Sequence, residues 1–362
     1  MAEANTSLGL ATTSNITSVF TNSTKIPVLS SGTSATLGIA ILSIAFIIGF
    51  PGNAFVIWTI MTQMKKRKVI CLLILHLAMA DIIVILTAPF FLHLLSTGSW
   101  IFGAIVCKMC YYICGFSMYT SIFLIMFMSI DRFLAVVRPF TKRTRTKPVV
   151  RSIIASIWIL AFLLAITMFF YRAVIPVYGR PFCIPFHTSS EHVIFQYTFE
   201  TVTGFVIPFT IIVSCYVYIG LRLRTAKFQT KEKTSRLVIM IIVTFALFWL
   251  PYQVVNMLQV SGEIFSSETL KNAAKTARPN AIAFAYLSSS ANPILYVFAG
   301  GNLIRRAGVG FMAKLFEGTA SETSSLRKMS QGFQQRKHTE AVKLEIGLEQ
   351  AESSNAPIPQ VV

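Results

Sequence analysis

The chain has 362 residues, a formal net charge of +18 and only 13% charged residues, and its mean hydropathy is +0.65. A soluble domain carries about 25% charged residues, so water cannot solvate most of this surface. The basic residues form short clusters between long apolar segments, as at membrane interfaces, and this distribution excludes nucleic acid as a partner.

The N-terminal segment predicts an extracellular tail. Residues 1–35 have no basic start and no long apolar stretch, so they do not form a cleavable signal peptide. They are rich in Ser, Thr and Asn, with acceptor sequences for glycosylation at Asn5, Asn15 and Asn22. We expect a disordered, glycosylated tail outside the cell.

Seven apolar segments are long enough to cross a bilayer as helices, which takes about 20 residues each. They lie at about 36–62, 68–95, 104–137, 149–170, 194–223, 235–261 and 275–299. Lipid tolerates only helices or closed barrels, and strands do not explain segments of this length. The sequence therefore predicts an all-α membrane protein with a seven-transmembrane helix bundle over residues 36–299.

Lysine and arginine near the segment ends predict the orientation. Basic clusters follow the first, third and fifth segments, and Arg305 and Arg306 follow the seventh, whereas the other connections are poorer in basic residues. We expect a multi-pass protein of the plasma membrane with its N-terminus outside and its C-terminus in the cytoplasm.

Two further regions follow the seventh segment. Residues 301–316 place apolar side chains near helical spacing among basic ones, which predicts a short amphipathic helix at the interface. Residues 317–362 are polar and predict a disordered cytoplasmic tail.

Polar groups and prolines inside membrane spans are costly and mark functional positions. They are Asn53, Asp81, Asp131-Arg132-Phe133, Trp158, Pro208, Phe248-Trp249-Leu250-Pro251 and Asn292-Pro293-Ile294-Leu295-Tyr296. With one group in each segment and in this order, residues 36–316 resemble the class A (rhodopsin-like) G-protein-coupled receptors.

The resemblance implies roles for these positions. A sodium ion acts as an allosteric modulator at Asp81, Ser121, Ser288 and Asn292; the alternative is a protonated Asp81 that is hydrogen-bonded in the core. The switch and the contact with a heterotrimeric G protein involve Asp131, Arg132, Tyr216, Trp249, Pro251 and Tyr296, although Trp249 could instead be a packed core residue. The resemblance also implies a disulfide between Cys107 and Cys183, with Cys110 as the competing partner.

The outer halves of the spans contain unusual charges that suggest the ligand. Arg172 ends the fourth span, Glu200 lies in the fifth and Arg278 begins the seventh. Two arginines beside an apolar pocket suit an amphiphilic anion with a carboxylate head. The alternative for each arginine is contact with lipid headgroups or a salt bridge with Glu200. Further hydrogen bonds are expected from Tyr111, Tyr252, Asn256 and Gln259.

Several stretches resemble the leukotriene B4 receptors, most closely the high-affinity type. They include Thr87-Ala88-Pro89-Phe90-Phe91-Leu92-His93, Tyr171-Arg172, residues 199–205, 248–252 and 287–293, and Ala307-Gly308-Val309-Gly310-Phe311-Met312-Ala313-Lys314-Leu315. The resemblance implies a dihydroxy fatty acid carboxylate as lipid agonist, inhibitory G proteins, arrestin and receptor kinases at the tail, and a role in leukocyte chemotaxis and inflammation. Tyr111 departs from a His of the close relatives, Pro279 from an Asn, and His76 from the Asn of most class A receptors.

Other functions fit the sequence less well. A chemoattractant receptor for another oxidised lipid or a peptide is the nearest alternative. A channel or transporter would show internal repeats or broken half-helices, and none stands out. No zinc pair, nucleophile turn or phosphate-binding loop indicates an enzyme, and no cofactor is expected besides sodium.

Overall fold

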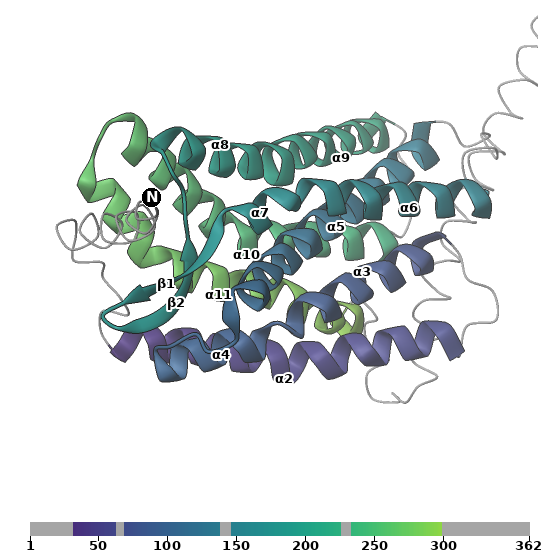
Figure 1. Cartoon of the computed structure of the whole chain (residues 1–362). Coiled ribbons are helices and arrows are strands. Elements are labelled where there is room, and N and C mark those ends of the chain that lie inside the picture. Colours follow the sequence, from purple (N-terminus) through teal and green to yellow (C-terminus); the bar gives the residue numbers. More distant parts are fainter. Residues whose placement is uncertain (1–31, 63–68, 138–145, 226–232, 299–362) are drawn as a thin grey trace, which may run out of the picture.

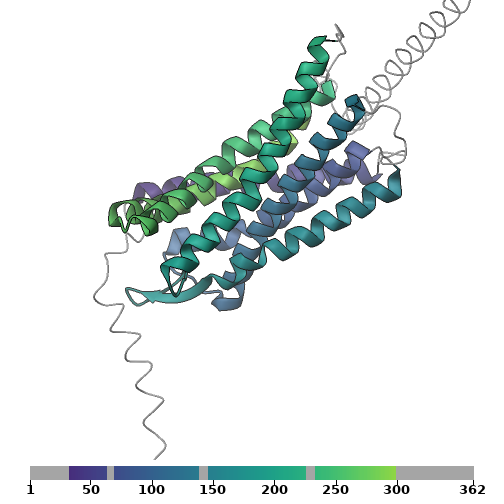
Figure 2. The same ribbon diagram turned by 90° about the horizontal axis from the view of Figure 1, so that it is seen from above.

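A computed structural model describes residues 32–62, 69–137, 146–225 and 233–298. The helices run side by side as a long bundle, with a β-hairpin at one end (Figures 1 and 2). The glycosylation sites Asn5, Asn15 and Asn22, the predicted amphipathic helix 301–316 and the tail 317–362 lie outside the described residues.

Seven helical segments form the bundle, and three of them consist of consecutive helices. The segments are α2 (Gly32–Thr62), α3 (Val69–Ile85) with α4 (Ala88–Thr97), α5 (Gly103–Val137), α6 (Lys147–Leu164) with α7 (Ile166–Phe170), α8 (Ser190–Thr201) with the π-helical turn η2 (Val202–Val206) and α9 (Ile207–Thr225), α10 (Lys233–Ile264), and α11 (Glu268–Phe298). The predicted seven-helix, all-α fold is confirmed.

Six of the seven segments are long and apolar enough to cross a membrane by composition alone. The exception among the described helices is α11, whose outer part carries charged residues such as Lys271 and Arg278 and whose inner part contains Ser288, Ser289 and Ser290. Arg278 and the three serines are buried, and α11 packs between α10 and α2. Its polar side chains therefore face the interior of the bundle, and a low hydropathy is compatible with a seventh span.

Three helices begin a turn or more earlier than predicted. α2 begins at Gly32 rather than at 36, α8 at Ser190 rather than at 194, and α11 at Glu268 rather than at 275. The added turns are polar, and a polar helix that projects beyond the hydrocarbon layer leaves no apolar signal in the sequence.

The hairpin corrects one expectation, because Arg172 does not end the fourth span. It begins strand β1 (Arg172–Val177), which pairs antiparallel with β2 (Arg180–Pro185). The connecting turn has left-handed backbone at Tyr178 and Gly179. Prolines in both segments made strands unexpected from the sequence. Both strands of a two-stranded sheet are edge strands, however, and edge strands tolerate residues without an N–H group.

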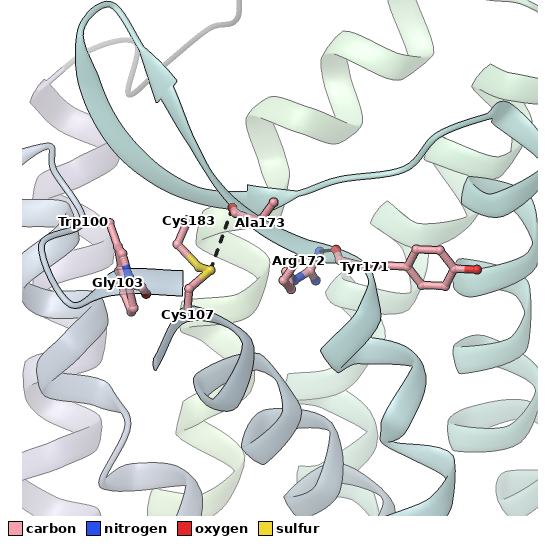
Figure 3. Close-up of a disulfide and its surroundings, with 7 residues drawn as sticks. All are labelled: Trp100, Gly103, Cys107, Tyr171, Arg172, Ala173 and Cys183. Atoms are coloured by element: carbon pink, nitrogen blue, oxygen red, sulfur yellow. Dashed lines mark hydrogen bonds between the residues drawn. A yellow bond between two sulfur atoms is a disulfide. The ribbon is translucent and has the colours of Figure 1, made fainter. Parts of the chain in front are cut away.

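A disulfide joins the hairpin to the bundle, as expected for Cys107 and Cys183, whose Cα atoms lie 5.7 Å apart. Cys110 remains a free thiol. Figure 3 shows Cys107 at the end of α5 beneath the hairpin, with Arg172 close by and the ring of Tyr171 directed away from the disulfide. The bridge thus anchors β2 directly, and the pairing of β1 with β2 holds the strand that carries Arg172.

Close helix packing requires glycine at one contact between α2 and α11. A Cβ atom on Gly52 would lie 2.9 Å from Cβ and Cγ of Pro293, and a proline ring cannot rotate away. In contrast, a Cβ atom on Gly220 in α9 would meet nothing within 4 Å.

We predict that Gly52→Ala destabilises the detergent-solubilised protein by about 1–3 kcal/mol, the usual effect of overpacking. The measurement is the midpoint of thermal unfolding. The control is Gly220→Ala, which should leave the midpoint unchanged or raise it, since alanine favours a helix. Equal midpoints for the two variants would contradict the close contact.

Candidate functional site

An apolar cavity lies between the helices, towards the end of the bundle that carries the β-hairpin. Its lining comes from several helices: Val84, Tyr111, Cys114, Gly115, Met168, Trp249, Tyr252, Ile282, Ala285, Tyr286 and Ser289. A mostly apolar lining is typical of pockets that bind small molecules. The space within it is about 30 Å³, so in this structure the lining side chains pack closely and would have to move apart to admit an extended ligand.

A break between α3 and α4 shapes one wall of this cavity. The Thr87 hydroxyl donates to the Val84 carbonyl over 2.6 Å and lies 2.6 Å from the Tyr286 hydroxyl. α4 begins beside a proline, which has no N–H group to continue the preceding helix. The sequence Thr87-Ala88-Pro89 thus turns the chain and ties α4 to α11 next to the cavity.

Two buried arginines stand beside the cavity. The guanidinium carbon of Arg172 lies 4.0 Å from the ring centroid of Tyr111, and that of Arg278 lies 4.1 Å from the ring centroid of Tyr197. Only 2% of Arg172 and 6% of Arg278 are exposed. Both side chains keep their charge at any physiological pH, so the cavity has a strongly positive end.

Several donors of these polar residues have no acceptor. Arg278 Nη1 donates to Asn256 Oδ1 over 2.7 Å, and Arg172 Nη1 donates to the Tyr171 carbonyl over 3.3 Å. Arg172 Nε, Arg278 Nη2 and Asn256 Nδ2 are buried without a partner in the described part of the chain. Buried donors without acceptors are rare, and together they form a site suited to a carboxylate.

Glu200 is fully buried, and both oxygens of its carboxylate accept hydrogen bonds from neighbouring side chains. Its Oε1 accepts from Gln196 Nε2 over 2.6 Å, and its Oε2 accepts from the Tyr252 hydroxyl over 2.9 Å. Among the described residues, no ion pair within 4 Å joins Glu200 to either arginine. The salt bridge considered as an alternative role for the arginines is therefore not formed in this structure.

The sequence analysis missed two residues of this polar group, Gln196 and His187. His187 Nε2 lies 2.6 Å from Gln196 Oε1, and the His187 ring stacks on Tyr171 at 4.9 Å. Gln196 precedes Glu200 by one helical turn, and this spacing was the available signal. His187 lies in the loop after β2, where nothing in the sequence indicates its partner.

Gln259, which was expected to bind ligand, has its partners in another polar group. Like Arg172, Glu200, Asn256 and Arg278, it is not part of the cavity lining. Its Nε2 donates to Glu263 Oε1 over 3.0 Å. Glu263 also accepts from the Ser190 hydroxyl at 2.8 Å and pairs with Lys271 at 3.4 Å. Gln259 therefore belongs to a polar cluster that joins the outer ends of α8, α10 and α11.

The candidate switch residue Trp249 lines the cavity. Its ring stacks on Phe245 at 5.7 Å and meets Tyr252 edge-on at 5.9 Å. Pro251 lies inside α10, where the missing N–H weakens the helix and permits a kink. A ligand in the cavity would thus contact the helix at its weakest point.

The candidate sodium site lies deeper in the bundle. Asn292 Nδ2 donates to Asp81 Oδ2 over 2.8 Å, and Asp81, Ser121 and Ser288 are buried. The Ser121 hydroxyl has no hydrogen-bond partner within the described residues. A carboxylate, hydroxyls and an amide oxygen are the hard ligands that sodium requires, so these residues fit the ion.

The candidate G-protein contacts lie at the opposite end of α5. Asp131 and Arg132 are both 6% exposed. Tyr216 of α9 packs against the main hydrophobic core of the bundle. Phe133, a departure from the frequent Tyr, meets Tyr218 edge-on at 5.2 Å. Tyr296 belongs to α11, but its side chain lies outside the described part of the structure.

His76 shows how one departure from the class A pattern is accommodated. Trp158 Nε1 donates to His76 Nδ1 over 3.2 Å, so the imidazole joins α3 to α6. A histidine at this position therefore serves packing between helices.

The comparisons with known proteins agree with this geometry. Residues 52–296 match the family model described as 7 transmembrane receptor (rhodopsin family). The chain is 49% identical over 298 residues to Leukotriene B4 receptor 1 of Homo sapiens, which covers 81% of this chain and 85% of that protein. The rat protein of the same name is 46% identical over 81% of this chain and 84% of its own. Human Leukotriene B4 receptor 2 is 38% identical over 80% and 83%, respectively.

The chain belongs to the rhodopsin family of seven-transmembrane receptors. The predicted resemblance to this family and to the leukotriene B4 receptors is confirmed. This rhodopsin-family receptor is a multi-pass membrane protein, and its family is a class of receptors rather than of enzymes.

The protonation state of His187 provides a test of the polar group at the mouth of the receptor cavity. Burial lowers the pKa of His187 to about 4, and the charges of Arg172 and Arg278 act in the same direction. The folded receptor thus keeps the imidazole neutral, while the unfolded chain takes up a proton below about pH 6.5. Stability should therefore fall as the pH decreases from about 6.5 towards 4.

We predict that acidification from pH 7.5 to 5 lowers the thermal midpoint of the wild-type receptor more than that of His187→Phe. Phenylalanine retains the stacking on Tyr171 but does not titrate. The comparison uses the change in thermal midpoint between pH 7.5 and pH 5, because the variant lacks the hydrogen bond to Gln196 at both pH values. The same pH dependence in both proteins would contradict a neutral, buried His187.

Proposed function

We propose that this receptor binds leukotriene B4 or a very similar dihydroxy fatty acid. The observation that carries the proposal is the pair of buried arginines with unpaired donors beside an apolar cavity. A fatty acid has the complementary form, with one carboxylate and a long apolar chain. The names of the relatives at 38–49% identity support the same ligand.

The charges of the site agree with a single carboxylate. Arg172 and Arg278 contribute two positive charges and Glu200 one negative charge, which leaves an excess of one positive charge. The carboxylate would accept hydrogen bonds from Arg278 Nη2 and Arg172 Nε, and Asn256 Nδ2 is a further donor. Tyr111 and Tyr252 line the cavity and offer hydroxyls to the polar groups of the chain.

Signalling is proposed to pass through inhibitory G proteins at the end of the bundle that carries Asp131 and Arg132. The receptor would lie in the plasma membrane with its N-terminus outside and its C-terminal tail in the cytoplasm, where arrestin and receptor kinases act. A role in leukocyte chemotaxis and inflammation follows from that ligand. The second candidate is a chemoattractant receptor for another oxidised lipid or a peptide.

We predict that Arg172→Ala and Arg278→Ala each weaken binding of leukotriene B4 by about tenfold to a hundredfold, since a hydrogen bond to a charged group contributes about 1.5–3 kcal/mol. The double variant should lose the response. The measurements are radioligand binding to membranes and G-protein activation, together with a panel of other eicosanoids and chemotactic peptides.

Arg180→Ala is the matched control, because Arg180 is an exposed arginine of the same hairpin whose Nη1 donates to the Thr97 carbonyl. It should bind the ligand like the wild type. The methyl ester of leukotriene B4 should bind the wild-type receptor weakly. A strong response to a peptide and none to any fatty acid would refute the proposed ligand.

We also propose that sodium binds at Asp81 with Ser121, Ser288 and Asn292. These residues belong to α3, α5 and α11, so the ion would tie three helices together in one arrangement. An agonist that shifts α11 relative to α3 and α5 would then oppose sodium binding, and the two affinities would be coupled.

We predict that replacing choline by sodium at constant ionic strength lowers agonist affinity by about fivefold or more, a typical allosteric coupling. Asp81→Asn should abolish this dependence, and sodium should also raise the thermal midpoint of the wild-type receptor only. A dependence on sodium that survives Asp81→Asn would place the ion elsewhere.

A further inference from the structure

A chain of three hydrogen bonds ends at both oxygens of Glu200. His187 Nε2 contacts Gln196 Oε1 at 2.6 Å, Gln196 Nε2 donates to Glu200 Oε1 at 2.6 Å, and the Tyr252 hydroxyl donates to Glu200 Oε2 at 2.9 Å. The amide oxygen of Gln196 can only accept. His187 Nε2 therefore carries the hydrogen, and it orients the amide so that its NH2 group faces Glu200.

The chain is buried at its Glu200 end and supported by Tyr171 at its half-buried His187 end. Gln196 and Glu200 have no exposed surface. The His187 ring stacks on Tyr171 at 4.9 Å with an angle of 23° between the ring planes. The Tyr171 carbonyl in turn accepts from Arg172 Nη1. The same residue thus supports the histidine and one of the two arginines.

Glu200 is the natural competitor of an anionic ligand. It interacts electrostatically with both Arg172 and Arg278, and Tyr252 bridges it to the second, since the Tyr252 ring centroid lies 6.0 Å from the Arg278 guanidinium. Opposite charges attract strongly where water is excluded. A Glu200 side chain without other partners would pair with an arginine and occupy its donors.

We propose that Gln196, oriented by His187, is a positioning residue that holds Glu200 away from the arginines and thereby keeps them available to the ligand carboxylate. This inference rests on the proposed function, because it requires an anionic ligand. Gln196 does not contact the ligand itself. It determines where the Glu200 carboxylate lies and therefore how much positive charge of the arginines is available to the ligand. The specificity of the pocket for an acid over its ester therefore depends on an amide outside the cavity lining.

The test is a double-mutant cycle with Gln196→Met and Glu200→Gln. Methionine has the length of glutamine but makes no hydrogen bond to Glu200. Gln196→Met should lower the affinity for leukotriene B4 by about tenfold or more in the wild-type background, as for other displaced charge pairs. In the Glu200→Gln background, Gln196→Met should lower the affinity for leukotriene B4 by less than about threefold, because an amide at position 200 cannot neutralise an arginine.

Two further variants separate positioning from packing. Gln253→Met removes a buried amide from the same α8–α10 interface, where Gln253 Oε1 accepts from Thr201 Oγ1 at 2.9 Å, and its effect should be equal in both backgrounds. His187→Phe should weaken binding in the same direction as Gln196→Met but less, and again only when Glu200 is present. Affinity for the methyl ester should not respond to Gln196→Met.

The outcomes distinguish this inference from the proposed function. If wild-type membranes bind no fatty acid carboxylate, the proposed function itself fails. If they bind it and Gln196→Met has the same effect with Glu200 and with Gln at position 200, only the positioning role is refuted. Loss of binding in Glu200→Gln alone also refutes it, since removal of the competing carboxylate leaves both arginines in place.

Discussion

The burial of two guanidinium groups is the constraint on which the outer half of this receptor depends. Arg172 and Arg278 cannot lose their protons, and a charge removed from water needs compensation from its surroundings. Ring faces at 4.0 and 4.1 Å and one amide oxygen supply part of it. Within the described residues, Arg172 Nε and Arg278 Nη2 have no partner, while Glu200 is bound to Gln196 and Tyr252. The charge of the arginines is therefore only partly compensated, and the proposed anionic ligand would complete the compensation.

The hairpin explains how an arginine from a loop reaches this buried position. Arg172 pairs with Pro185 at the open end of the hairpin, directly after the last turn of α7. The disulfide between Cys107 and Cys183 anchors the opposite strand to α5, and Val174 pairs with Cys183 in the ladder. Only Ala173 lies between Arg172 and Val174, so the covalent link limits the movement of the arginine. A hairpin at one end of the bundle thus determines the chemistry inside it.

The length of the apolar segments made the helix bundle predictable from the sequence. Contacts between residues far apart in the sequence produce no such pattern and could not be predicted. Asp81, Arg172, Glu200 and Arg278 could be singled out because a charge in an apolar segment needs a reason, and all four are buried. Gln259 was expected to offer a further hydrogen bond to the ligand, but its amide donates to Glu263, one turn further along α10. His187 and Gln196 escaped notice because polar residues near a span end are common. The β-hairpin was not predicted because its two strands contain three prolines, and proline is uncommon in strands.

A continuous set of contacts joins the charged mouth of the cavity to the weakest point of α10. The Tyr252 hydroxyl holds Glu200, and the Tyr252 ring meets Trp249 at 5.9 Å. Trp249 stacks on Phe245, one turn further from the hairpin end of the bundle. Pro251 lies between Trp249 and Tyr252, where the helix lacks a backbone hydrogen bond. A carboxylate bound by the arginines, as proposed, would change the electrostatic field around Glu200 and hence the hydrogen bond between Glu200 and Tyr252. Because Tyr252 and Trp249 lie on either side of Pro251, this change would act where bending α10 costs least. A local change in charge would in this way become a movement of the helix.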